Sequence, residues 1–180
     1  MVDALTEADF SQRGPWQAPL PTPPAVNRIS APNLKSRLAE PGDVAIIDLS
    51  LHAAYRQGHL PGAWFAQRSR LAEAIENIPP AGLYVLTCTT SQQAEFAVPE
   101  LAALVSDPVV VLTGGNKAWR DAGFALDTGS ARIATPPIDR YRRPYEGTDN
   151  PREAMQGYLD WEYGLVEQLG RDGTHGFFVI

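Results

Sequence analysis

The chain has 180 residues, of which 44% are hydrophobic and 20% charged, and its formal net charge is −6. This composition is typical of one globular domain with extensions. The negative charge argues against a general nucleic-acid binder, because phosphate contacts require clustered Lys and Arg. The N-terminus carries acids where a signal peptide carries basic residues, and no apolar run is long enough to span a membrane. We therefore expect a cytoplasmic protein with no membrane or nucleic-acid partner.

Residues 1–26 contain the proline-rich stretch GPWQAPLPTPPA. Proline fixes φ and lacks a backbone N–H, so such a stretch blocks both helices and central strands. We predict an N-terminal arm or linker over residues 1–26.

Between residues 27 and 127 the pattern changes to short apolar strands that alternate with helical segments. Strands are predicted over 44–49, 83–87 and 108–113 and within 58–65, and helices over 30–38, 52–57, 69–78 and 92–105 and after 114–115. In this pattern Ser30 and Ser69 are the expected helix caps. Strands that are apolar throughout and separated by helices indicate a parallel sheet with helices on both faces. The predicted fold class is therefore doubly wound α/β.

Residues 128–180 are predicted to form a C-terminal extension. Asn150, Pro151 and Glu153 are typical of a helix start, and an apolar stripe continues at helical spacing to residue 169, so we expect a helix over 151–169 ended by Gly170. This stripe can pack on the same domain, or it can contact another module or a second subunit. The sequence leaves both interpretations open.

The only cysteine lies in LYVLTCTTSQQA (83–94), just past the end of a predicted strand. Ligands of parallel α/β sheets bind beyond the carboxyl ends of the strands. The polar residues 89–93 then lead into a helix, and Thr90 with Gln93 fits a capping box. Loop N–H groups and the helix N-terminus would stabilise a Cys88 thiolate. The alternative is a small core residue, because free cysteine is among the most buried residue types.

Three segments follow one another in the sequence: IIDLSLHAAYRQGHLPGA (46–63), LYVLTCTTSQQA (83–94) and VVVLTGGNKAWRDAGFAL (109–126). Taken together and in this order they resemble the rhodanese family, and the resemblance covers residues 27–127. The remaining tail resembles the end of longer bacterial proteins built from several rhodanese modules. The chain is therefore expected to correspond to the C-terminal module of such a protein.

The resemblance implies a five-stranded parallel sheet and a sulfurtransferase activity. A sulfur donor such as thiosulfate would transfer its outer sulfur to Cys88, and the resulting persulfide would pass it to a thiol or cyanide. The loop residues Thr89, Thr90, Ser91, Gln92 and Gln93 would hold the persulfide. Such covalent catalysis predicts ping-pong kinetics and requires no metal or organic cofactor.

The loop departs from the C-x-x-G-x-R pattern of many rhodaneses, because Ser91 stands at the glycine position and Gln93 at the arginine position. An uncharged loop lacks a charge-assisted hydrogen bond to an anionic donor. Arg68 or Arg70 could replace that charge, whereas Lys117 and Arg120 are interpreted as surface charges.

Two alternative functions remain at this stage. One is a catalytically weak rhodanese module with a binding or regulatory role in a larger protein. The other is a phosphatase of the related dual-specificity type, which is disfavoured because no arginine closes the loop. Three further residues are given structural roles: Asp48 orders the strand end, His59 makes a hydrogen bond in its turn, and Trp119 lies in the core.

Overall fold

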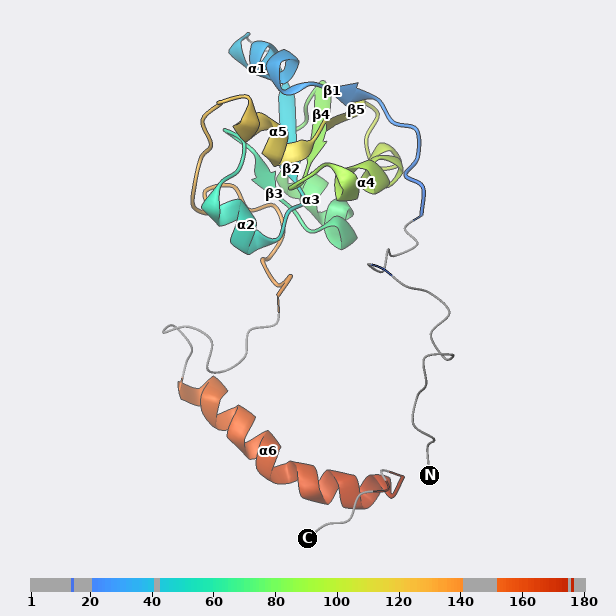
Figure 1. Ribbon diagram of the computed structural model, residues 1–180, viewed down its shortest axis with the longest axis vertical. Helices are drawn as coiled ribbons and strands as arrows, with labels where there is room; N and C mark the ends of the chain where they lie inside the picture. Colours follow the sequence, from blue (N-terminus) through green and yellow to red (C-terminus); the bar gives the residue numbers. More distant parts are fainter. Residues whose placement is uncertain (1–13, 15–20, 41–42, 141–151, 175, 177–180) are drawn as a thin grey trace. The chain divides into compact units, whose positions relative to one another are not determined.

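Five parallel strands form the centre of the N-terminal part of the chain (Figure 1). The computed structural model describes residues 14, 21–40, 43–140, 152–174 and 176. The strands are β1 (Arg28–Ile29), β2 (Val44–Asp48), β3 (Trp64–Phe65), β4 (Leu83–Thr87) and β5 (Val109–Leu112). Their order in the sheet is β1-β5-β4-β2-β3, and every pair is parallel. The carboxyl ends of the strands therefore meet at one edge, where Asp48 of β2 lies beside Thr87 of β4.

Helices cover both faces of this sheet. The helices are α1 (Ala31–Ala39), α2 (His52–Gln57), α3 (Leu71–Asn77), α4 (Gln92–Ala102) and α5 (Gly115–Asp121). One buried cluster joins Ile46 and Val85 to residues of α1, α2 and α5, and a second joins Ile47 and Leu86 to residues of α3 and α4. Neighbouring strand residues point to opposite faces, so the continuous apolar runs supply both clusters. The predicted doubly wound α/β class with a five-stranded parallel sheet is confirmed.

The structure differs locally from the sequence prediction at β1 and at Ser69. The two-residue edge strand β1 was not predicted. Ser69 does not cap a helix, because it lies inside the 3₁₀ turn η2 (Arg68–Arg70), and Arg70 is the residue that precedes α3. By contrast, Ser30 caps α1 as predicted, since its hydroxyl accepts a hydrogen bond from the Asn33 N–H at 3.4 Å.

The chain continues to contact the sheet domain after residue 127. Asp127 forms an antiparallel bridge with His59, and Ile133 forms a parallel bridge with Phe65. The Gln67 N–H donates to the Thr135 hydroxyl at 2.9 Å. The first of the chain's two compact units accordingly extends to Thr135, and the second begins at Pro136.

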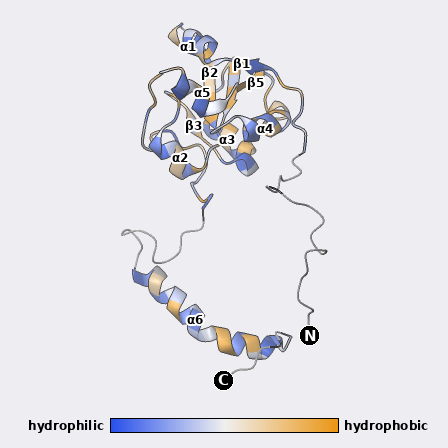
Figure 2. Cartoon of the chain, viewed as in Figure 1, coloured by the Kyte–Doolittle hydropathy of each residue, from blue (hydrophilic) through white to orange (hydrophobic). Residues whose placement is uncertain are grey.

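The second unit contains the helix α6 (Arg152–Asp172). The predicted end at Gly170 is wrong, because the helix continues through this glycine, and the predicted start at Asn150 and Pro151 lies outside the described residues. Hydrophobic and hydrophilic residues alternate along α6 (Figure 2), and several large apolar side chains are exposed. No helix within the described parts of the chain is long and apolar enough to cross a membrane. Most of the proline-rich arm is also outside the described residues, and residues 21–27 form neither helix nor strand.

Candidate active site around Cys88

Cys88 follows β4 directly, at the edge where the strands end. Its surface is only 4% exposed, and it belongs to the buried cluster on the α3 and α4 face, together with Leu49, Ala66 and Ala94. It is a free cysteine. The thiol therefore lies at the bottom of the loop, partly in the core, which combines features of the two interpretations that the sequence left open.

In the backbone of the Cys88 loop, the first carbonyl groups are hydrogen-bonded within the described chain and the N–H groups of residues 89–93 are not. The Cys88 carbonyl accepts a hydrogen bond from the Asn116 N–H at 2.8 Å, and the Thr89 carbonyl accepts one from the Lys117 N–H at 3.1 Å. None of the N–H groups of residues 89–93 donates to an acceptor within the described parts of the chain. Five successive donors are therefore available to an anion, as in the backbone nests that bind phosphate. The N-terminus of α4 adds its partial positive charge.

Ser91 gives the loop its shape. It is the N-cap of α4 with φ 69° and ψ −18°, which is the left-handed region that favours glycine. Its hydroxyl donates to the Thr90 carbonyl at 2.6 Å and accepts from the Gly114 N–H at 3.2 Å. The predicted capping box of Thr90 and Gln93 is wrong, because α4 begins at Gln92 and no side chain caps it. The residue at the glycine position of the C-x-x-G-x-R pattern is thus a serine whose hydrogen bonds oppose the backbone strain.

Gly115 allows α5 to lie directly against the loop. A Cβ atom at this position would lie 2.1 Å from the Cys88 carbonyl oxygen and 2.6 Å from the Ser91 nitrogen. Gly115 also has φ +60°. No residue with a side chain fits this position without moving the loop.

A buried network of polar side chains lies between the loop and the carboxyl ends of β2 and β4. The Asp48 carboxylate accepts hydrogen bonds from the Ser50 N–H at 2.8 Å and the Asn116 side-chain amide at 2.7 Å. The Asn116 side-chain oxygen accepts one from the Thr87 hydroxyl at 2.8 Å. Burial raises the pKa of Asp48, while the hydrogen bonds from Ser50 and Asn116 partly oppose this rise. The network joins the ends of β2 and β4 to α5, which agrees with the structural role expected of Asp48.

Asn116 is a residue of this site that the sequence reasoning missed. Its backbone binds the Cys88 carbonyl and its side chain bridges Asp48 and Thr87. The available signal was its position directly after the glycine pair that opens α5.

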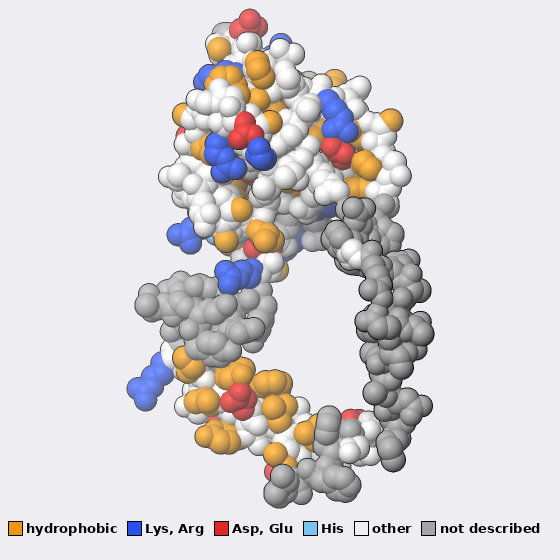
Figure 3. Space-filling model, in the orientation of Figure 1, with side chains coloured by type: hydrophobic (Ala, Val, Ile, Leu, Met, Phe, Trp, Pro, Cys, Tyr) orange, Lys and Arg blue, Asp and Glu red, His pale blue; other side chains and the backbone are white. Residues whose placement is uncertain are grey.

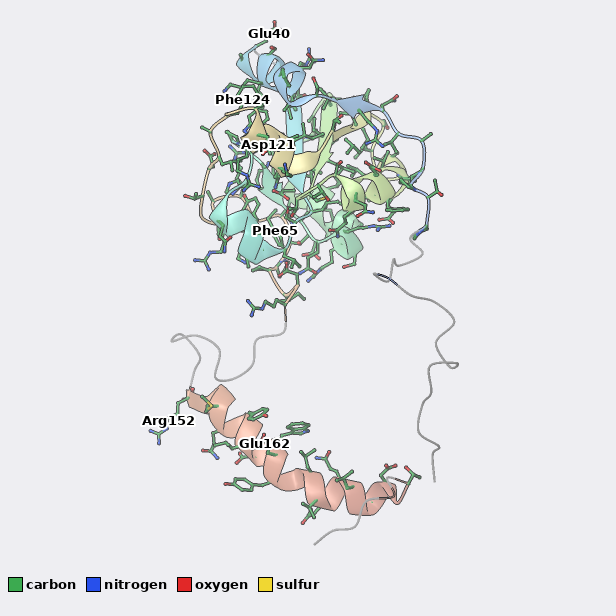
Figure 4. The ribbon with its side chains drawn as sticks, in the orientation of Figure 1. Glu40, Phe65, Asp121, Phe124, Arg152 and Glu162 are labelled. Atoms are coloured by element: carbon green, nitrogen blue, oxygen red, sulfur yellow. The ribbon has the colours of Figure 1, made fainter. Side chains whose placement is uncertain are left out.

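His59 and Trp119 have the structural roles predicted for them. The His59 Nδ1 atom lies 2.8 Å from the Tyr55 carbonyl oxygen, and the two rings stack with 3.8 Å between their centroids. The Tyr55 hydroxyl donates to the Ala63 carbonyl at 2.7 Å, and burial raises the pKa of Tyr55 to about 12. Trp119 is 1% exposed and packs edge-on against Phe124, which Figure 4 labels.

The candidate cations Arg68 and Arg70 both lie beside carboxylates. Arg68 pairs with Glu100 of α4 at 2.5 Å and also donates to the Phe96 carbonyl at 3.3 Å. This pairing lowers the pKa of Glu100. Arg70 pairs with Glu73 at 2.6 Å. Each guanidinium is thus largely committed within the protein, and a role in substrate binding stays a prediction.

A pocket of about 260 Å³ lies on the other face of the loop from Cys88. Its lining includes Thr89 of the loop, Ala54 of α2, Asn116 and Arg120 of α5, and Leu126. Cys88 is not part of this lining, because its side chain belongs to the α3 and α4 cluster. Within the described residues, no group of three or more His, Cys, Asp or Glu side chains is arranged to hold a metal ion.

The parallel sheet and the loop around a free cysteine define the class of protein. Residues 30–122 match the Rhodanese-like domain family, so the chain belongs to the rhodanese family. Among solved structures, the crystal structure of a thiosulfate sulfurtransferase from Pseudomonas aeruginosa is 57% identical to this chain, with a TM-score of 0.86. The match covers 99% of this chain and 34% of that protein, so the chain spans about a third of its relative's length.

A more distant relative has the same fold in a shorter chain. The rhodanese-like domain of the Alr3790 protein from Anabaena, solved by NMR, is 25% identical, with a TM-score of 0.50. That match covers 64% of this chain and 89% of the Anabaena chain. No match was found among curated proteins.

Proposed function

We propose that this chain is a sulfurtransferase that carries sulfane sulfur as a persulfide on Cys88. The observation that supports this best is the position of the only cysteine at the head of five loop amides that have no acceptor within the described parts of the chain. The 57% identity to one part of a thiosulfate sulfurtransferase supports the same reaction class.

The reaction proceeds in two displacements. The Cys88 thiolate attacks the outer sulfur of thiosulfate, the donor's S–S bond breaks, and sulfite leaves with the bonding electron pair. A thiolate or cyanide acceptor then attacks the outer sulfur of the persulfide, and the Cys88 thiolate leaves. No net oxidation of the enzyme occurs over the cycle. Covalent storage of the sulfur between the two steps gives ping-pong kinetics.

The loop amides would act on the charge of the sulfur. The terminal persulfide sulfur is anionic, and hydrogen bonds to an ionised acceptor are roughly twice as strong as neutral ones. Because the donors belong to a backbone fixed by Asn116 and Gly115, they need little rearrangement when the charge moves from the donor to the loop.

Intact mass after incubation with thiosulfate tests the proposal. We expect a gain of one sulfur atom that a reducing agent removes and that the Cys88→Ser variant does not show. If neither thiosulfate nor other persulfide donors add sulfur while Cys88 remains open to alkylation, the sulfurtransferase proposal is wrong.

A second candidate function is a binding or regulatory module within a larger protein. Two observations favour it: the chain spans 34% of its P. aeruginosa relative, and Leu159, Trp161 and Val166 of α6 are exposed. For this chain alone the testable partner is a second copy. Sedimentation at increasing concentration should show self-association that Leu159→Asp weakens and the polar control Gln168→Asp does not. A monomer at every concentration, together with full sulfur transfer, would remove the support for this candidate.

A further inference from the structure

A buried carboxylate lies next to Ser91 of the Cys88 loop. Glu95 stands in the first turn of α4, its side chain is only 11% exposed, and the Ser91 hydroxyl lies 3.4 Å from its Oε1 atom. The same oxygen accepts a hydrogen bond from the Arg28 guanidinium of β1 at 2.6 Å. The edge strand that the sequence did not predict therefore brings a cation to a carboxylate of the loop.

This ion pair differs in burial from three other pairs of the sheet domain. Their carboxylate side chains are between 35% and 55% exposed, and the pairs are Arg68 with Glu100, Arg70 with Glu73 and Lys117 with Asp121. Figure 3 shows basic and acidic side chains side by side on this unit. Water and salt screen exposed charges strongly and buried charges much less. An unpaired Glu95 would thus make the potential at the loop more negative.

The free amides of the loop are also within the usual reach of a carboxylate such as Glu95. Acidic side chains in the first turn of a helix commonly accept hydrogen bonds from the free N–H groups there. Within the described parts of the chain, Glu95 accepts none from residues 89–93, and its Oε1 atom is bound by Arg28 and Ser91 instead. The pairing with Arg28 therefore leaves these amides without an internal anion.

We propose that Arg28 is a positioning residue of the Cys88 site, which holds and neutralises Glu95 so that the loop amides stay free for an external anion. The inference rests on the proposed sulfurtransferase function, in which those amides bind the anionic persulfide. It also explains how a loop that carries no charge over residues 88–94 accepts an anion. The negative charge of α4 beside the loop is cancelled from β1.

Two alkylating reagents measure the electrostatics at Cys88 without sulfur transfer. Iodoacetate and iodoacetamide both form an S–C bond at the thiolate and release iodide, but only iodoacetate is an anion. A change in thiolate content or in access to the thiol alters both rates alike. The ratio of the two rate constants therefore reports the potential at the loop, and a merely structural role of Arg28 leaves it unchanged.

Arg28→Gln should lower the iodoacetate-to-iodoacetamide ratio of the full chain roughly threefold or more, as expected for one nearby charge in partly solvated surroundings. Adding Glu95→Gln should bring the ratio back to the wild-type value, because both charges are then gone. Arg28→Lys, which keeps the charge, should retain most of the ratio. The matched control is Arg37→Gln, which removes the same charge from an exposed residue of α1, on the opposite face of the sheet from α4.

Each outcome supports or overturns the proposal. It is overturned if Arg28→Gln has the same ratio as Arg37→Gln, or if the double variant stays as low as Arg28→Gln, because Arg28 would then act without Glu95. If Cys88 resists both reagents, the thiosulfate concentration for half-maximal sulfur uptake decides: Arg28→Gln should raise it and the double variant should restore it. The ratio needs no sulfur transfer, so its failure leaves the sulfurtransferase proposal standing, while a chain that neither reacts nor takes up sulfur overturns both.

Discussion

The two kinds of backbone group in the Cys88 loop have opposite roles. Its first two carbonyls are held by N–H groups of α5, while the amides of residues 89–93 have no acceptor in the described chain. The fixed carbonyls set the loop geometry, and the free amides are left for a ligand. This division teaches that a loop can be rigid and still have unused donors, provided that a neighbouring element satisfies its other groups.

The most severe way to break this arrangement is to remove the sulfur. Cys88→Ser should reduce sulfur transfer to the uncatalysed background, because a serine hydroxyl is a far weaker nucleophile than a thiolate. Its unfolding midpoint should stay close to that of the wild type, since the two side chains have similar size. Turnover with thiosulfate and cyanide measures the first effect, and thermal unfolding measures the second. Wild-type turnover in Cys88→Ser would refute the mechanism.

A change that pushes α5 away from the fixed carbonyls of the loop should have the next largest effect on turnover and stability. Gly115→Ala places a Cβ atom 2.1 Å from the Cys88 carbonyl oxygen, at a backbone with φ +60°. We expect a loss of about 2–4 kcal/mol in the free energy of unfolding, together with a large loss of turnover. Urea unfolding gives the first value. The control is Gly82→Ala, where a Cβ would meet no atom closer than 3.8 Å. Equal stability of both variants would show that α5 does not press on the loop.

Asn116→Ala removes the bridge between the loop and the buried network. It leaves the Asp48 carboxylate and the Thr87 hydroxyl without their shared partner, at a cost of about 2–3 kcal/mol. Urea unfolding should show this loss at neutral pH. A variant as stable as the wild type would mean that water replaces the amide fully.

The raised pKa of Asp48 predicts how stability changes with pH. The folded state binds the Asp48 proton more tightly than the unfolded state, whose pKa lies near the ordinary 3.8. Folding stability therefore falls as the pH rises from about 3.8 through the raised pKa. Asp48→Asn lacks this titration, so its unfolding free energy should fall less than that of the wild type across this window. Parallel pH profiles of the two proteins would contradict the raised value.

Substitutions of Ser91 should have the smallest effect, and they test how the loop geometry is held. Ser91→Ala keeps the left-handed backbone but loses the hydrogen bonds of the hydroxyl with Thr90, Glu95 and Gly114, and we expect it to lose about 1–2 kcal/mol of stability. Ser91→Gly loses the same bonds but removes the strain, so it should be less destabilised than Ser91→Ala. Urea unfolding of both variants separates the two contributions. If Ser91→Gly is the less stable of the two, backbone strain at this residue is negligible.

The strands and the family could be predicted because both depend on patterns that extend over many residues. The apolar runs of β2 and β4 are long enough to indicate buried strands, and the run of β4 placed Cys88 at a strand end. The three rhodanese-like segments in their order indicated the family. The edge strand β1 has only two residues, which is too short for a periodic signal. The end of α6 was also missed, because a glycine near a helix end need not terminate it.

Other features depend on contacts between distant segments. The left-handed backbone of Ser91 is held partly by Gly114, and the bridge of Asn116 exists only when β2, β4 and α5 are assembled. Likewise, Arg68 meets Glu100 only because η2 packs beside α4. Arg120 lines a pocket only because α5 packs near α2 and the Cys88 loop. No pattern within a single segment contains this information.

The contact of Gly115 with the Cys88 loop also sets an order of events during protein synthesis. The ribosome makes the loop before it makes the glycine pair and Asn116, so the newly made cysteine has no folded support at first. The thiol acquires its final surroundings only when α5 has emerged and docked. A chain that stops before α5 would present Cys88 on an unsupported loop, and chain completion and assembly of the Cys88 site are thereby linked.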